Sequence, residues 1–328
     1  MDEIIECVVN VSEGRDQRII DKLKSAIISS RGTQLLHTDT GYDANRTVFT
    51  FVADRYHMGC TIDALFDSAL RLIDMSQHQG KHPRLGAIDV CPFIPIRGIT
   101  KSDLILWVLT QAESLSNRFK VPIYLYADSA QDLHHINLAD IRRGEYEDLQ
   151  GRIKDGINLP DFGRHHDPAK SGATIMGVRS FLLAYNVNLS TKDVQIAKKI
   201  AQHIRGSGYK TKQGNHIKGL FSSVRAIGWF IEEYGCAQVS MNLTDYHVTG
   251  LYDVYEACKT LASTLGTNVD GSELIGLAPL KAITSSGERY CPKLRDNAEL
   301  IECANYHLGL SSLSTFDPKQ RIIEYLLV

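Results

Sequence analysis

The sequence predicts an α/β (α+β) protein built from two βαββαβ subdomains in tandem, with helices on the outer faces of their sheets. The chain has 328 residues, which suits two domains of ordinary size. Hydrophobic residues make up 43% of it and charged residues 23%, as in an ordinary globular protein. The order of β-rich and amphipathic stretches in the first half also recurs in the second. We therefore expect subdomains at 1–178 and 179–328, with a ligand cleft between them.

The first half begins with a β-rich run, 4–9, and Ser12 stands where a helix cap is expected, ahead of an apolar stripe. A strand at 87–96 carries Pro92 and Pro95, which cannot donate to a ladder, so we expect an edge or bulged strand. Two helices should cover one face of an antiparallel sheet. The other elements expected here are strands at 34–39 and 46–53, a helix around 62–72, a helix at 104–119 and a further strand of the same sheet at 122–127.

Charges and turn-forming residues dominate 129–170, which predicts a surface crossing that becomes a binding loop. A mobile loop is expected at 206–214. Roughly the last 40 residues are predicted to be helical, with Asp317-Pro318 starting the final helix. The elements expected between these regions are strands at 181–189, 224–232, 237–243 and 273–277, and helices at 193–204 and 251–265.

The charge pattern favours a small-molecule partner. The net charge is −2 and the Lys and Arg residues are scattered, which argues against a nucleic-acid or membrane surface. No charged-then-apolar leader and no apolar run of membrane-spanning length is present, so we expect a cytoplasmic protein. The seven cysteines are odd in number and include no Cys-x-x-Cys pair, which predicts reduced core thiols.

The stretch 74–95 is the predicted centre of the site. Its first half places imidazole, ammonium and guanidinium groups around Gly80 and Pro83, where a helix cannot continue. Its second half is the predicted strand 87–96, which would hold this polar loop rigidly. His82 has an unperturbed pKa near neutrality, and Arg84 offers a planar fork to a carboxylate. A solvent-facing histidine without a function is the alternative.

Three other chemistries are less favoured by the spacing. His78 and His82 are four residues apart, which suits a metal only on a helix, so no metal site is expected. The run Gly206-Ser207-Gly208 lacks the third glycine of a nucleotide site. Cys91 lies in an apolar strand, which favours a structural thiol over a nucleophile.

Further polar residues stand at predicted strand ends and would converge if those strands end on one edge: Asn10, Glu13, Asp39, Asn45 and Arg46. Each could otherwise serve only a cap or a turn. In the second half, alternation puts Asn186 and Asn188 on one face of a strand. Two amides on a core face need partners, so we expect that face to line a cleft.

Ten short runs follow one another in a single register over nearly the whole chain: 10–14, 45–47, 74–76, 82–84, 89–95, 121–126, 160–163, 172–174, 238–240 and 276–282. Together these runs resemble the glutamate formimidoyltransferase family, also called the formiminotransferase domain family.

The resemblance implies two ferredoxin-like subdomains with folate held in a basic passage between them. It also implies transfer of a formimino group from N-formimino-L-glutamate to nitrogen 5 of tetrahydrofolate, in histidine degradation. Tetrahydrofolate is then a co-substrate and no metal is required. The alternatives are a transferase that uses N-formyl-L-glutamate and a catalytically silent folate-binding protein, against which the intact His82-Pro83-Arg84 argues. The sequence leaves the oligomeric state open, with a homodimer as one possibility.

Residue by residue, the family's catalytic histidine falls on His82, where one imidazole would act as base and then as acid. Arg46, Arg84 and Lys170 would bind the carboxylates of donor and folate. The folate segment falls on 163–172, where Gly163 and Gly172 match and the middle departs from the animal enzymes. The residues implied there are Gly163, Arg164, Lys170, Ser171 and Gly172.

The runs 210–218 and 287–300 also depart from the family pattern. The animal enzyme joins this domain to a cyclodeaminase. Since no sequence follows the final helix for such a partner, we expect only the transferase activity.

Overall fold

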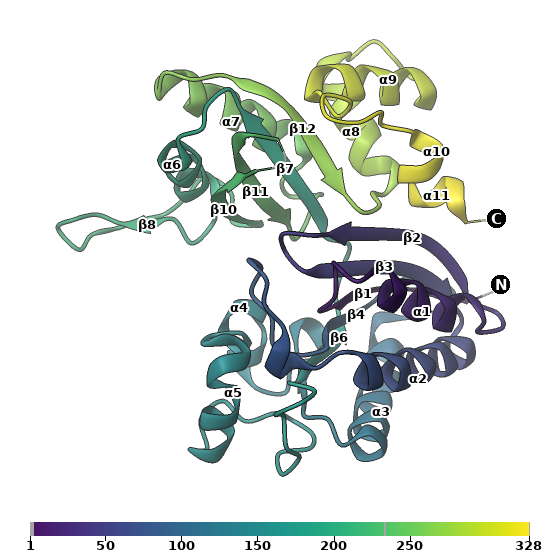
Figure 1. The fold of residues 1–328 in the computed structure, drawn as a ribbon. Coiled ribbons are helices and arrows are strands. Elements are labelled where there is room, and N and C mark those ends of the chain that lie inside the picture. The colour runs from purple at the N-terminus through teal and green to yellow at the C-terminus, as the bar shows by residue number, and fades with distance from the viewer. Residues whose placement is uncertain (1–2, 233, 328) are drawn as a thin grey trace. The chain divides into compact units, whose positions relative to one another are not determined.

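A computed structural model describes residues 3–232 and 234–327 of the chain, which separates into two units, Met1–Arg179 and Ser180–Val328. Each unit has its own β-sheet and its own apolar core (Figure 1). Within the described residues, no helix combines the length and the apolar character needed to cross a membrane. The predicted class, an α/β protein with two tandem subdomains, is confirmed.

The first unit begins with the predicted βαββαβ order. Its elements are β1 (Ile4–Val11), α1 (Gln17–Ile28), β2 (Gln34–Gly41), β3 (Arg46–Ala53), α2 (Arg55–Leu72) and β4 (Ile88–Arg97). The side chain of Asp16 caps α1 by accepting a hydrogen bond from the Arg18 amide, so the prediction that Ser12 is the cap is wrong. Ser12 instead donates its hydroxyl to the Gly86 carbonyl, at 2.8 Å, and ties β1 to the segment before β4.

The Pro-bearing strand β4 lies inside the sheet, between β1 and β6 (Thr174–Val178), so the predicted edge position is wrong. Its pairing with β1 contains register shifts at both ends, as expected for a bulged strand. The register with β1 gives Pro92 no partner, and Pro92 pairs only with Gly177 of β6. An interior strand therefore tolerates this proline because the ladder is incomplete where the proline lacks its N–H.

Beyond β4 the sheet is mixed rather than antiparallel. Its strand order is β2-β3-β1-β4-β6-β5, and β6 pairs in parallel with both β4 and β5 (Ile123–Leu125). The sequence prediction had no strand at 174–178, and it extended β5 beyond its three residues. The crossing 129–170 contains two short helices, α4 (Leu138–Ile141) and α5 (Glu145–Lys154), and follows the long helix α3 (Lys101–Phe119).

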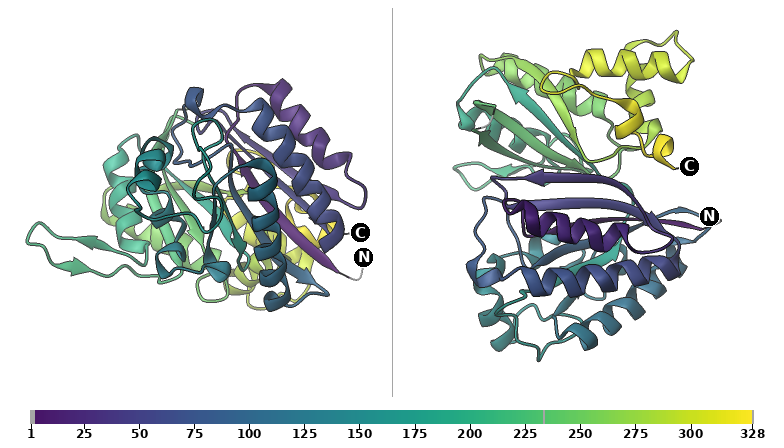
Figure 2. Two further views of the ribbon diagram at one scale, coloured as in Figure 1. Left: turned by 90° about the horizontal axis from the view of Figure 1, so that it is seen from below. Right: turned by 45° about the vertical axis from the view of Figure 1, so that its right-hand side comes forward.

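Apolar clusters cover both faces of this sheet. Ile123 and Leu125 of β5 belong to the large cluster under α1, α2 and α3, and Tyr124 between them belongs to a smaller cluster with Ile141 and Leu149 of α4 and α5. Neighbouring residues of a strand point to opposite faces, which explains this division. Figure 2 shows α1, α2 and α3 lying alongside one another. The two layers hold β4, and hence the segment before it, from both sides.

The second unit repeats the order of the first. Its sheet order, β10-β11-β7-β12, corresponds to β2-β3-β1-β4. A small hairpin, β8 (Tyr209–Lys210) and β9 (His216–Ile217), occupies the predicted loop and extends away from this sheet (Figure 2). The main elements are β7 (Leu183–Leu189), α6 (Val194–Ile204), β10 (Val224–Ile231), β11 (Cys236–Leu243), α7 (Leu251–Thr264) and β12 (Val269–Ile275).

Four helices close the chain: α8 (Leu280–Tyr290), α9 (Asn297–Leu308), α10 (Pro318–Arg321) and α11 (Ile323–Leu326). Asp317 caps α10 as predicted, but α11 follows it, so α10 is not the final helix. The expectation of seven reduced core thiols is also wrong. Cys291 and Cys303 form a disulfide, and Cys60 is exposed. The remaining cysteines, of which Cys7, Cys91 and Cys258 are buried, are free.

Candidate active site

The loop that carries His82 is fixed by Asn45, the residue directly before β3. Asn45 has a left-handed φ of 48°, and its side chain accepts from the Gly14 amide and donates to the Gln79 carbonyl, both at 2.9 Å. Its own carbonyl accepts from Nε2 of His78 at 2.8 Å. A Cβ on Gly80 would lie 2.2 Å from the backbone oxygen of Ala44, so only glycine allows this close approach. Asn45 therefore holds the loop in place through hydrogen bonds of its side chain and its backbone carbonyl.

His82 lies partly buried beside Arg46 and contacts two groups through one ring nitrogen. Nδ1 of His82 is 2.7 Å from Nη1 of Arg46 and 2.8 Å from the carbonyl oxygen of Pro83. A guanidinium only donates and a carbonyl only accepts, so the two contacts require opposite protonation states of Nδ1. No other partner is recorded for the ring among the described residues, which leaves Nε2 without one.

Arg46 connects His82 to a set of charged and polar side chains around the buried Asp89. Its Nε donates to Oδ1 of Asn10 at 2.9 Å, and its Nη1 lies 3.4 Å from Oδ2 of Asp89. Asp89 of β4 is 1% exposed, and it also accepts a hydrogen bond from Nη2 of Arg142, which follows α4. The other oxygen of Asp89 accepts from the Leu85 amide at 2.9 Å. Strands of the sheet and the crossing segment 129–170 thus contribute side chains to one cluster.

The cluster is electropositive, and this changes the acid–base behaviour of its members. Burial and then the neighbouring Arg46 and Arg142 lower the pKa of His82 to about 3. Burial and the neighbouring Arg142 lower the pKa of Arg46 to about 10. His82 is therefore neutral near pH 7, and two guanidiniums share the single carboxylate of Asp89. One positive charge is left without a carboxylate partner within this cluster, which suits an anionic ligand.

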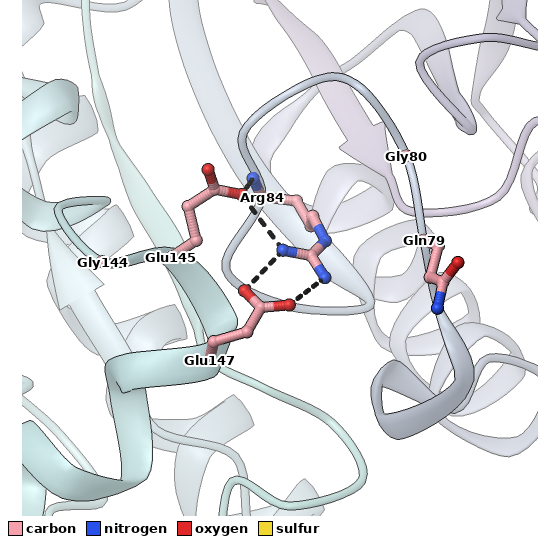
Figure 3. Close-up of a pocket in the computed structure, with 6 residues that line it drawn as sticks. All are labelled: Gln79, Gly80, Arg84, Gly144, Glu145 and Glu147. Atoms are coloured by element: carbon pink, nitrogen blue, oxygen red, sulfur yellow. Dashed lines mark hydrogen bonds and ion pairs between the residues drawn. The ribbon is translucent and has the colours of Figure 1, made fainter.

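Arg84 lies beside a hollow of ≈ 440 Å³ and is held by protein carboxylates (Figure 3). Its guanidinium donates to Glu147 at 2.6 and 2.7 Å and to Glu145 at 3.0 Å. The Arg84 side chain is 9% exposed, and it also donates to Nδ1 of His78 at 3.3 Å. Glu147, Glu145 and His78 therefore occupy the fork that was predicted for a substrate carboxylate. The hollow is lined by Gln79, Gly80, Arg84, Gly144, Glu145 and Glu147.

The predicted folate segment 163–172 runs alongside the His82 loop. The Lys170 carbonyl accepts from the Met75 amide at 2.9 Å, and the Ser171 carbonyl accepts from the Ala87 amide at 2.8 Å. Gly172 has φ +64° and forms a bridge with Gly86. The backbone thus brings 170–172 to the segment before β4, and the side chain of Lys170 is exposed.

Gly163 and Arg164, at the other end of this segment, are held by other groups. Gly163 has φ +72°, and a Cβ there would meet Oγ of Ser116 at 2.4 Å. The exposed Arg164 donates through Nε to the Pro160 carbonyl at 3.0 Å. Gly163 is explained by its backbone conformation alone.

The structure joins some of the predicted site residues and leaves others apart. His82, Arg46 and Asn10 form one hydrogen-bonded set, and Asn45 and Arg84 are linked through His78. Within the described residues, no hydrogen bond or ion pair joins Asp39, half-buried in β2, or Arg164 to either set. The partners that sequence reasoning missed are Asp89, Arg142, His78, Glu145 and Glu147. A lone carboxylate in an apolar strand, as at Asp89, was the available signal for a buried ion pair.

In the second unit, the asparagines predicted to share a face do share a polar network. Asn186 donates to Glu273 at 3.0 Å, and Gln238 donates to both Glu273 and Asn188, at 2.9 and 2.8 Å. Trp229 donates its ring N–H to Gln238 at 2.7 Å. Nδ2 of Asn188 is buried without a partner. The prediction that this face lines a cleft stays a prediction.

The fold and the site define a two-unit α/β protein whose first unit places a neutral histidine among partly buried arginines, an arrangement suited to acid–base chemistry on an anionic small molecule. Two family models match the chain: the formiminotransferase domain, N-terminal subdomain, over residues 4–179, and the formiminotransferase domain over residues 184–328. The chain belongs to the formiminotransferase domain family, which confirms the resemblance seen in the sequence.

Curated relatives agree with this assignment. Formimidoyltransferase-cyclodeaminase of Dictyostelium discoideum is 42% identical over 339 residues, covering 100% of this chain and 61% of that protein. The enzyme of the same name from Mus musculus is 42% identical over 335 residues, covering 100% of this chain and 60% of that protein. Glutamate formimidoyltransferase of Streptococcus pyogenes serotype M1 is 39% identical over 290 residues, covering 88% of this chain and 94% of that protein. The chain thus spans about three fifths of the cyclodeaminase relatives.

Proposed function

We propose that this chain is a glutamate formimidoyltransferase, which moves the formimino group of N-formimino-L-glutamate to nitrogen 5 of tetrahydrofolate. Its partners would be these two small molecules, tetrahydrofolate being a co-substrate, and its location the cytoplasm. Family membership and the name of the Streptococcus relative support the reaction. The observation that carries the proposal is the 2.7 Å contact between His82 and Arg46 in a partly buried cluster with excess positive charge.

The donor is a dicarboxylate, and the Arg46 cluster offers it a complementary charge. Among the described residues, Asp89 is the one carboxylate that pairs with Arg46 and Arg142, so a donor carboxylate would supply the missing negative charge. Hydrogen bonds between a guanidinium and a carboxylate are about twice as strong as neutral ones. Arg46 is a better candidate for this role than Arg84, because Glu145 and Glu147 already engage the guanidinium of Arg84.

The transfer needs one proton removed and one proton delivered. Nitrogen 5 of tetrahydrofolate attacks the formimino carbon and loses its proton, the bond from that carbon to the glutamate nitrogen breaks, and the departing amine gains a proton. We assign both proton movements to the imidazole of His82, which would act first as base and then as acid. The lowered pKa of His82 keeps the base form populated in the free protein.

Binding of the donor would also tune this base. Because Arg46 and Arg142 lower the pKa of His82, a bound carboxylate that compensates their charge raises that pKa toward its ordinary value of about 6.5. A general acid–base catalyst works best when its pKa lies near the operating pH. His82 would therefore become an efficient proton carrier when the anionic donor is in place.

For folate, we propose the segment 163–172, with the exposed Lys170 and Arg164 available to the glutamyl carboxylates. The backbone bonds of Lys170 and Ser171 to the 75–87 region support this, because they keep the segment beside the loop of His82. Gly172 allows the segment to lie this close, because a Cβ at that position would be 2.1 Å from the backbone oxygen of Leu85.

The direct test is an assay of the purified chain with tetrahydrofolate and N-formimino-L-glutamate, following 5-formimino-tetrahydrofolate and glutamate by mass spectrometry. The proposal expects both products in equal amounts. A parallel reaction with N-formyl-L-glutamate separates an imino donor from a formyl donor. No product from the formimino donor, with a correctly folded chain, would refute the proposal.

A further inference from the structure

The last helices of the second unit bring three metal-binding side chains together. Helices α8 and α9 cross closely at Gly287, where an added Cβ would lie 2.2 Å from the backbone oxygen of Leu300. Cys291 ends α8 one turn after Gly287, and Cys303 lies one turn after Leu300 on α9. His307 follows Cys303 by four residues. The glycine crossing therefore sets Cys291 against the face of α9 that carries Cys303 and His307.

The geometry of these side chains suits a single ion. Residues four apart on a helix share a face, so Cys303 and His307 point the same way. One ligand atom from each of Cys291, Cys303 and His307 lies within 4.8 Å of the others. Tetrahedral zinc, with Zn–S of about 2.3 Å and Zn–N of about 2.0 Å, needs ligand atoms roughly 3.5–3.8 Å apart. Small side-chain rotations would bring the three ligand atoms to the separations that tetrahedral zinc needs.

The two sulfurs are joined in this structure, so a metal could enter only after reduction. The Cα atoms of Cys291 and Cys303 are 6.7 Å apart, close to the upper limit of about 6.8 Å for a disulfide. Reduction by a dithiol breaks the S–S bond and yields two thiols, while the reductant becomes a disulfide. Zinc binding then releases the two thiol protons.

We propose that Cys291, Cys303 and His307 form a redox-controlled zinc site, which binds Zn²⁺ as the dithiol and excludes it as the disulfide. Two thiolates and an imidazole are the ligands that zinc prefers, and no carboxylate belongs to the cluster. His307 is exposed, so water can take the fourth position. The ring of Tyr290 stacks on His307, with centroids 4.5 Å apart, and holds the imidazole in place.

The site is separate from the transferase chemistry proposed above. Its three ligands belong to the second unit, whereas His82 belongs to the first. Either bridge, disulfide or zinc, connects the end of α8 to α9, so the reduced protein without metal should be the least stable form. Zinc then replaces the cross-link that reduction removes.

The test uses Co²⁺ as a spectroscopic probe on the full chain, reduced by a phosphine under anaerobic conditions. We expect one equivalent of Co²⁺ to bind with thiolate-to-cobalt charge-transfer absorption and tetrahedral d–d bands, and Zn²⁺ to displace it. The disulfide form should show neither band. Cys303→Ser should weaken binding by about tenfold or more, since even outer-shell changes cost 10–100-fold. Cys60→Ser, at an exposed cysteine outside the cluster, is the matched control and should bind as the wild type does.

His307→Ala keeps the proposal testable if Cys303→Ser fails to fold, because His307 is exposed and its truncation leaves the core intact. This variant should keep the charge-transfer absorption but lose about tenfold or more in affinity. Absence of charge-transfer absorption in the reduced wild type would overturn the proposal. So would unchanged affinity in His307→Ala, equal binding by the disulfide form, or loss of the absorption only in Cys60→Ser.

Discussion

Nδ1 of His82 lies 2.7 Å from a guanidinium nitrogen of Arg46 and 2.8 Å from the carbonyl oxygen of Pro83. If Arg46 donates, Nδ1 is unprotonated and the neutral ring carries its proton on Nε2. If Nδ1 donates to Pro83, then Nε2 has the free electron pair. The balance between Arg46 and Pro83 therefore decides which ring nitrogen can receive a proton from a substrate.

We predict that the His82 ring titrates well below the ordinary histidine value of about 6.5 in the wild type and closer to it in Arg46→Met. Burial is the largest cause of the lowered pKa and remains in the variant, but the nearest cation is removed. The measurement is a pH titration of the ring resonances by NMR. His135 is an internal control because its raised pKa reflects Asp161 and Asn158, which outweigh burial there. An unchanged His82 titration in Arg46→Met would contradict the electrostatic explanation.

We predict that His82→Ala lowers turnover by about 10² to 10⁴, the usual contribution of general acid–base catalysis, with little change in folding. His82 lies on a loop and outside the apolar core clusters. Steady-state rates with tetrahydrofolate and N-formimino-L-glutamate give the effect, and circular dichroism checks the fold. His134→Ala, at an exposed histidine of the same unit, should keep wild-type turnover. Retention of more than about a tenth of the wild-type rate in His82→Ala would remove His82 from the mechanism.

We predict that Arg84→Met destabilises the first unit by about 1–3 kcal/mol, because it leaves the His78 carbonyl without its charged donor and frees two carboxylates. Glu147→Gln should cost less, about 1 kcal/mol or below, since Glu147 is 60% exposed. Denaturant unfolding measures both. The control, Arg143→Met, removes a surface guanidinium that is 81% exposed. If Arg84→Met raised only the KM for the donor and left stability unchanged, substrate binding would be the better assignment for Arg84.

We predict that Gly172→Ala is more destabilising than Gly156→Ala. Both glycines have φ near +70°, where an alanine costs roughly 1–2 kcal/mol. At Gly172 the added Cβ would also lie 2.1 Å from the Leu85 oxygen, whereas at Gly156 nothing lies within 4 Å. The difference between the unfolding free energies of the two variants measures how much the close approach of the proposed folate segment to the His82 loop contributes to stability. Folate affinity should fall in Gly172→Ala only. Equal losses of stability and of folate affinity in the two variants would show that the close approach contributes to neither.

The order of the secondary elements was predictable because it rests on local periodicity. The apolar stripe of Ile20, Leu23 and Ile27 in α1 and the alternation in β7 are visible in short windows of sequence. The strand β6 was not predictable in this way. Its five residues follow a turn-rich stretch, and it is stabilised by parallel pairing with β4 and β5, which lie far from it in the sequence. The interior position of β4 depends on the same pairing.

The candidate site was predictable in its residue types and only partly in its contacts. Arg46 and Asn10 meet as expected from strand ends at one edge, and His82 joins them from the loop before β4. The ion pair between Asp89 and Arg142 joins residues 53 apart, and no local pattern specifies such a pair. The engagement of Arg84 by Glu147 has the same long-range origin. Polar partners that meet only in the folded chain leave no periodic signal.

We predict that the folded protein loses stability toward acid because His82 is held neutral in it. The pKa of His82 is about 3 in the folded protein and about 6.5 when unfolded, so below pH 6.5 the unfolded chain binds more protons. His82 therefore contributes stability that is complete above about pH 6.5 and is lost as the pH falls toward 3. Burial and the neighbouring Arg84 also lower the pKa of His78, which acts in the same direction. His82→Asn removes only the first contribution.

The free energy of unfolding in denaturant, measured between about pH 5 and about pH 7, should fall more steeply toward acid for the wild type than for His82→Asn. The difference in slope can reach at most about 1.4 kcal/mol per pH unit, the value for one proton. Carboxylates titrate mainly below this window, so they contribute little to the difference. His134→Asn is the control, and it should follow the wild-type curve. Parallel curves for the wild type and His82→Asn would mean that His82 is not held neutral by its surroundings, and the proposed tuning of its pKa by the donor carboxylate would fail with it.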